Sequence, residues 1–111
     1  LYLTSALKNA SIVRTKNFAA SIEIFNEHHA DALAGLKPNL IDSMHQIPDG
    51  RLLPGNFMTI NHGFAIALGK EAANAFLQNF VQDLIASGFV AESIEKHQIK
   101  GLIAIQNDPH I

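Results

Sequence analysis

The sequence predicts an α/β fold with a mainly parallel sheet. Short apolar or β-branched runs alternate along the chain with helical patterns of about 10 to 17 residues, and this alternation is typical of strands joined by crossover helices. Of the 111 residues, 48% are hydrophobic and 16% are charged. This balance is typical of a globular domain that buries one core.

Three helices are predicted in the first half of the chain, at residues 1–9, 17–29 and 39–46. Asn17 and Asn39 are suitable N-cap residues for the second and third, because an asparagine side chain accepts a hydrogen bond from a free backbone N–H of the first turn. The turn-forming sequence Pro48-Asp49-Gly50 follows the third helix. On the second helix one apolar stripe consists of Phe18, Ile22 and Phe25.

Four segments are expected to be strands: residues 11–15, 31–35, 51–53 and 57–68. The last gives the strongest signal, because large apolar side chains alternate there with alanines. Gly63 interrupts it and indicates a bend or a close approach of the backbone. The alternating large residues are Phe64, Ile66 and Leu68.

Two further helices are predicted after this segment. Residues 71–87 carry a wide apolar face, and Gly88 is expected as the C′ residue that ends the helix. A last helix covers residues 90–97, and the apolar run 102–105 follows. Phe76 and Phe80 are expected to lie in the core, although the same stripe could contact a partner helix.

Charge and composition exclude several functions. Eight Lys and Arg against ten Asp and Glu give a formal charge of −2, and no basic patch is present, so nucleic acid is not expected as a partner. Residues 52–68 are nearly uncharged, but Pro54, Gly55 and Gly63 prevent them from forming a bilayer helix. There is no cysteine, which excludes disulfides and thiolate chemistry.

No catalytic, cofactor or metal motif is recognisable. Of the six histidines, His28 and His29 are adjacent and the others lie far apart, whereas a helix needs an i, i+4 pair to chelate one ion. No serine lies in a Gly-x-Ser-x-Gly elbow, and the isolated glycines match no phosphate-binding loop. Asn61-His62-Gly63 is the least ordinary segment, because two polar side chains interrupt an apolar run; it indicates a hinge or a cleft, or else a simple loop.

Four segments, taken in order, resemble the amino-acid type of bacterial extracellular solute-binding proteins, the receptor subunits of ABC importers. They are LYLTSALKNASIVRTKNFAASIEIF, DALAGLKPNL, GNFMTINHGFAIALGKEA and FLQNFVQDLIASGFVAESIEKHQIKG. Together they cover nearly the whole chain.

The resemblance implies a periplasmic-binding-protein-like fold: two α/β lobes joined by crossing strands, with the ligand in the cleft between them. Residues 1–60 would be most of the second lobe, and residues 61–111 the crossing segment and the C-terminal elements that pack on a first lobe absent from this sequence. A periplasmic receptor of this kind, without catalysis, cofactor or metal, passes a small polar or carboxylated solute to an ABC permease. We expect a second copy, or the missing N-terminal lobe, to cover the incomplete sheet.

The same resemblance places five residues at the ligand cleft. In many family members an acidic residue at the position of Leu36 meets the α-ammonium group of the ligand, and the absence of a carboxylate here argues against a free amino acid. The arginine that holds the ligand carboxylate belongs to the first lobe, so we expect the fragment to bind weakly. The five candidates are Gly35, Leu36 and Lys37, in a loop, and Asn61 and His62, in the crossing segment.

Two alternatives stay open. A few members of the fold family are dehydratases, and an acidic residue paired with His62 or Lys37 in the cleft would favour an enzyme. A sensory or structural interaction module is the other alternative, and a transmembrane segment encoded downstream would favour it.

Overall fold

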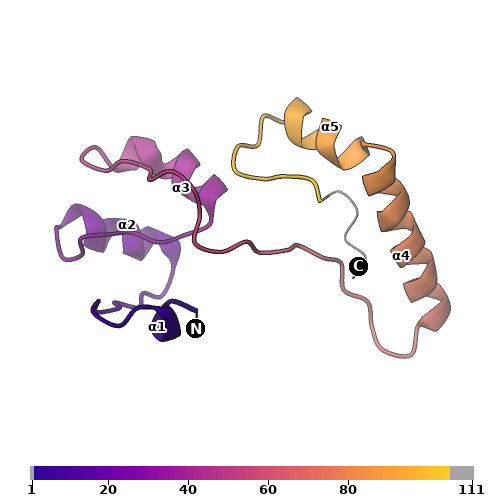
Figure 1. The fold of residues 1–111 in the computed structure, drawn as a ribbon, viewed down its shortest axis with the longest axis horizontal. Coiled ribbons are helices and arrows are strands. Elements are labelled where there is room, and N and C mark those ends of the chain that lie inside the picture. The colour runs from indigo at the N-terminus through magenta and orange to yellow at the C-terminus, as the bar shows by residue number, and fades with distance from the viewer. Residues whose placement is uncertain (1, 106–111) are drawn as a thin grey trace. The chain divides into compact units, whose positions relative to one another are not determined.

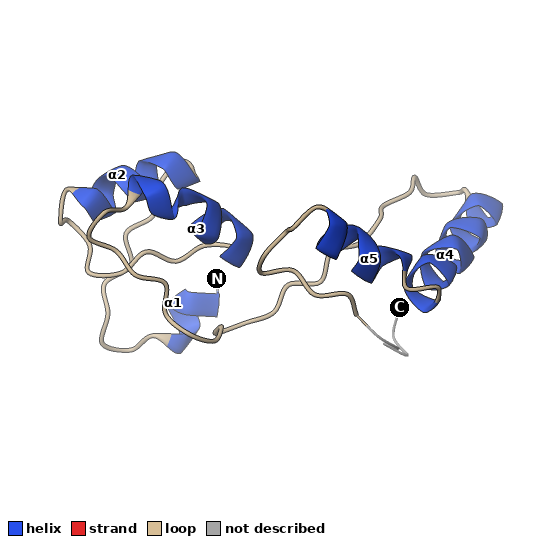
Figure 2. Cartoon of the chain, turned by 90° about the horizontal axis from the view of Figure 1, so that it is seen from above, coloured by secondary structure: helices blue, strands red, loops and turns tan. Residues whose placement is uncertain are grey.

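The computed structural model describes residues 2–105. Within this range it consists of helices joined by loops, as Figure 1 and Figure 2 show. The chain divides into two compact units, Leu1–Leu52 and Leu53–Ile111. None of the described helices combines the length and hydropathy that crossing a bilayer would need.

The predicted α/β fold is wrong, because the described residues contain no strand. Residues 11–15, 31–35, 51–53 and 57–68 are all loop. A strand needs a second extended segment that accepts and donates its backbone hydrogen bonds. The backbone hydrogen bonds observed outside the helices are all local, joining residues at most five positions apart. Crossing strands, and the two-lobed α/β fold built on them, are therefore absent from the described residues.

The first unit contains three α-helices and one 3₁₀ helix. The prediction of a helix capped by Asn17 is confirmed, since the Asn17 side chain accepts a hydrogen bond of 2.9 Å from the backbone N–H of Ala20. The third helix begins earlier than predicted: Leu36 is its N-cap, Pro38 lies in its first turn and Asn39 lies within it. The elements are α1 (Tyr2–Ala6), α2 (Phe18–Asn26), α3 (Lys37–Ser43) and η1 (Met44–Gln46).

The apolar stripe of α2 forms the core of the first unit. Ile22 and Ile47 are 7% and 4% exposed and are the only buried hydrophobic residues in the described part of the chain. Phe18 and Phe25 flank Ile22 on the same face and are half-buried. Burying an isoleucine side chain contributes about 1.5–3 kcal/mol, so this small core stabilises the unit only modestly.

The described residues of the second unit form two helices, α4 (Glu71–Ala86) and α5 (Phe89–Lys96), as predicted to within one or two residues. Gly88 separates them and has φ +82°, a left-handed conformation that glycine adopts without steric cost. Its N–H donates to the carbonyl of Ile85, and its own carbonyl accepts from the N–H of Glu92. The one glycine thus ends α4 and caps α5.

Much apolar surface remains in contact with water. The accessible surface of the chain is 9394 Å². Two separate globular bodies, each with half of the 12.1 kDa mass, would together expose about 7,300 Å². In the second unit Phe64 and Phe76 are both 71% exposed, and the prediction that Phe76 and Phe80 lie in the core is wrong. Taken together, the two units therefore bury less surface than two folded domains of their size.

Asn17 should be a stabilising cap and Asn39 should not. We expect Asn17→Ala to lower the free energy of unfolding of the first unit by about 1 kcal/mol, because an N–H at the start of α2 loses its acceptor. Asn39→Ala is the matched control, and we expect it to be neutral or slightly stabilising, because alanine is the better helix former within α3. Urea denaturation followed by far-UV circular dichroism measures both, and the opposite ranking would contradict the observed start of α3.

Candidate functional site

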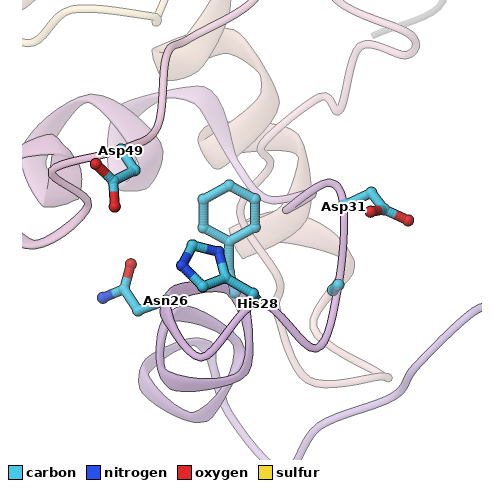
Figure 3. Close-up of a pocket in the computed structure, with 6 residues that line it drawn as sticks. Asn26, His28, Asp31 and Asp49 are labelled. Carbon is cyan, nitrogen blue, oxygen red and sulfur yellow. The ribbon is translucent and has the colours of Figure 1, made fainter.

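A pocket lies in the first unit, where the end of α2 meets the turn after η1 (Figure 3). Its volume is about 250 Å³, slightly below the roughly 300–1,000 Å³ of most small-molecule sites. A ligand of a few non-hydrogen atoms would fit. The residues that line it are Phe25, Asn26, His28, Ala30, Asp31 and Asp49.

The end of α2 positions one wall of the pocket. His28 has φ +57°, the left-handed conformation that closes a helix. Its N–H donates to the carbonyl of Phe25 at 3.1 Å, and the N–H of His29 donates to the carbonyl of Ile24 at 3.1 Å. This pair of bonds is a Schellman motif, which turns the chain sharply and places the His28 ring at the pocket.

Asn26 connects this wall to the other side of the pocket. Its side-chain Nδ2 donates a hydrogen bond of 2.8 Å to the carbonyl of Gln46, twenty residues further along the chain. Because the nitrogen is used in this way, the Oδ1 atom of Asn26 remains as a hydrogen-bond acceptor.

The turn after Ile47 forms the opposite wall and carries Asp49. The N–H of Gly50 donates to the carbonyl of Ile47 at 3.1 Å and closes the turn. A Cβ atom on Gly50 would overlap the side chain of Ile47 and would lie 3.4 Å from the ring of Phe25. A Cβ atom at position 50 would therefore clash within the turn itself, and glycine lets the turn close on Ile47 next to Asp49.

The pocket is rich in acceptors. Figure 3 shows Asn26 and Asp49 on one side of the His28 ring, whereas the Asp31 carboxylate points away. Asp49 and Asn26 Oδ1 therefore offer a carboxylate and an amide oxygen, and the half-buried Phe25 offers an aromatic ring. This combination suits a small cation with N–H donors and an apolar part.

The five residues predicted for the cleft do not line this pocket. Gly35 has a packing role, because a Cβ atom there would lie 2.8 Å from the ring of Phe18. Leu36 and Lys37 form the exposed start of α3. Asn61 and His62 are exposed residues of a loop in the second unit. The structure thus does not bring the two groups together within either unit.

The sequence offered only partial signals for the pocket. The Pro48-Asp49-Gly50 turn and the end of the second helix are both recognisable, but their meeting depends on the Asn26–Gln46 bond and on the packing of Ile47. These contacts join residues about twenty positions apart, which periodicity alone does not reveal.

No group of three or more histidine, aspartate or glutamate side chains in residues 2–105 is arranged to hold a metal ion. His110 lies outside the described residues. Comparison of the chain with protein-family models, with curated proteins and with solved structures found no match.

Gly50→Ala should destabilise the first unit by about 1–3 kcal/mol, because the added methyl group must displace Ile47 or Phe25. Gly63→Ala is the matched control, since a Cβ atom there has no neighbour within 4 Å; we expect no loss of stability. Urea denaturation followed by circular dichroism distinguishes the two. Equal effects of both substitutions would show that the turn does not close tightly on Ile47.

Proposed function

We propose that this chain takes part in the non-catalytic binding of a small polar solute, as part of the receptor component of an ABC importer. Two independent observations support the proposal. The order of the four segments that resemble solute-binding proteins supports the receptor role. The pocket beside Asp49 supports solute binding, and it is the observation that carries the proposal.

The lining of the pocket narrows the class of solute. Acceptors dominate, and the nearest formal charge is the negative charge of Asp49. A carboxylate ligand would be repelled by Asp49, whereas an ammonium group gains a charge-assisted hydrogen bond. The preferred solute is therefore a small organic cation and not a carboxylate.

The expected affinity is low. An exposed ion pair with Asp49, a hydrogen bond to Asn26 and a contact with the Phe25 ring each contribute about 1 kcal/mol. Their sum, about 3 kcal/mol, corresponds to a Kd on the order of 10 mM. In this proposal a receptor needs further polypeptide to close the pocket from the solvent side, and this chain contributes one wall of the site.

A chemical-shift titration of the full chain with butylammonium tests the proposal. We expect the backbone amides of Asn26, His28 and Asp49 to shift with a Kd on the order of 10 mM. Butanoate, which has the same carbon chain and the opposite charge, should leave these amides unchanged.

Two aspartate variants provide the matched comparison. Asp49→Asn should weaken butylammonium binding by up to about fivefold, because the ion pair worth about 1 kcal/mol becomes a neutral hydrogen bond. Asp42→Asn removes the same charge from an exposed residue of α3 that does not line the pocket, and it should change the affinity less than about twofold. Equal losses of affinity in both variants, or equal chemical-shift changes with butanoate, would contradict the proposal. They would show that the cation is attracted by the overall charge of the chain and is not bound at this pocket.

A further inference from the structure

Residues 58–68 of the second unit have backbone N–H and C=O groups that could form hydrogen bonds with a neighbouring strand. Residues 58–67 are loop with no turn among them, and a turn follows at residues 68–69. Within the described part of the chain, residues 59–68 take part in no backbone–backbone hydrogen bond. Ten consecutive residues without proline thus have N–H and C=O groups with no backbone partner in the described part of the chain.

The side chains of this segment follow the pattern of a strand with one large and one small face. Successive residues of a strand point to opposite faces, so even and odd positions separate. The even positions carry Met58, Ile60, His62, Phe64, Ile66 and Leu68, and the odd positions carry Thr59, Asn61, Gly63, Ala65 and Ala67. The segment therefore has the sequence of a strand and lacks only a partner.

We propose that two copies of this chain associate by pairing residues 58–68 as antiparallel strands, with the two-fold axis passing through Gly63. A symmetric pair joins residue i of one copy to residue j of the other and the reverse. Placing the axis on Gly63 uses the whole segment and keeps both large faces on one side of the ribbon. The pairs on this side are Met58 with Leu68, Ile60 with Ile66, and His62 with Phe64.

A second copy of this chain is a suitable pairing partner for residues 58–68. Residues 52–69 contain no Asp, Glu, Lys or Arg, so self-pairing brings no like charges together. Natural sheet edges are usually protected by such charges or by prolines, and residues 55–69 have neither. At the axis the two Gly63 residues face each other on the small side, and a Cβ atom at Gly63 would meet nothing within 4 Å.

The apolar area that the pair offers is adequate for a weak dimer. The five apolar residues of the large face, Met58, Ile60, Phe64, Ile66 and Leu68, are 45%, 53%, 71%, 39% and 101% exposed. With roughly 150–200 Å² for each large side chain, the large face of one copy exposes about 500 Å², and two copies offer about 1,000 Å², near the lower limit of specific interfaces.

A two-stranded ribbon needs a cover on its large face to be stable, and α4 of the same unit can supply one. The apolar arc of α4 is wider than the part shielded by α5. Phe76 and Phe80 remain exposed, with ring centroids 6.1 Å apart and nearly parallel planes. In the dimer this arc folds over the large face of the ribbon.

Sedimentation equilibrium of the full chain, combined with infrared spectroscopy, tests the pairing. We expect the average mass to rise from 12.1 kDa towards twice that value between about 1 μM and 1 mM. The β-strand amide I band, which a monomer of helices and loops lacks, should rise in proportion to the dimer. A monomer at every concentration, or a dimer without this band, would overturn the proposal.

A charge exchange tests the register. Ile60→Lys alone or Ile66→Glu alone should weaken dimerisation about tenfold, because each places like charges or a lone charge on the large face. The double variant I60K/I66E should restore it to within about threefold, because this register sets the two substituted positions opposite each other. The control I60K/A67E places the charges on opposite faces and should remain weak.

These variants lie outside every described helix, so the helical circular dichroism signal should stay unchanged and report that the chain remains folded. Full dimerisation of Ile60→Lys would place the interface elsewhere and overturn the proposal. Failure of I60K/I66E to recover, with the helical signal intact, would overturn the register centred on Gly63.

Discussion

The burial of Ile22 and Ile47 is the constraint on which the first unit depends. These two side chains are the only hydrophobic ones in the described residues that water hardly reaches, and they lie on α2 and on the turn after η1. Once Ile47 is buried, Gly50 can approach Phe25, the Asn26 amide reaches the Gln46 carbonyl, and Asp49 comes to the end of α2. The pocket is therefore a consequence of core formation, and a loss of this core removes the site as well.

The difference between helix and strand explains how much of the fold could be predicted. A helix satisfies its backbone within one segment, so Asn17, Gly88 and the apolar periodicity were sufficient to locate α2, α4 and α5. A strand is completed by another segment, and sequence pattern reports only the tendency to be extended. Residues 57–68 have that tendency and find no partner within the described chain. All four strand predictions failed for this one reason.

In the candidate site, too, the local features could be predicted from the sequence and the contacts between distant residues could not. The turn at Asp49 and the adjacent histidines at the end of the second helix were visible in the sequence, but their meeting was not, because Asn26 and Gln46 are twenty residues apart. The cleft residues implied by resemblance were tied to a two-lobed architecture. Without strands to connect Leu36 to His62, those residues lie in different units and share no site within either of them.

At His28 the backbone conformation and the chemistry of the side chain can change independently of each other. The backbone conformation ends α2 and shapes the pocket wall, and glycine or asparagine adopts it with equal or greater ease. The imidazole ring is thus not required for the helix to end, although it lines the pocket. Evolution could exchange the chemical group at this one position at little expense to folding, so the chemistry of the pocket wall can change at His28 while the architecture stays constant.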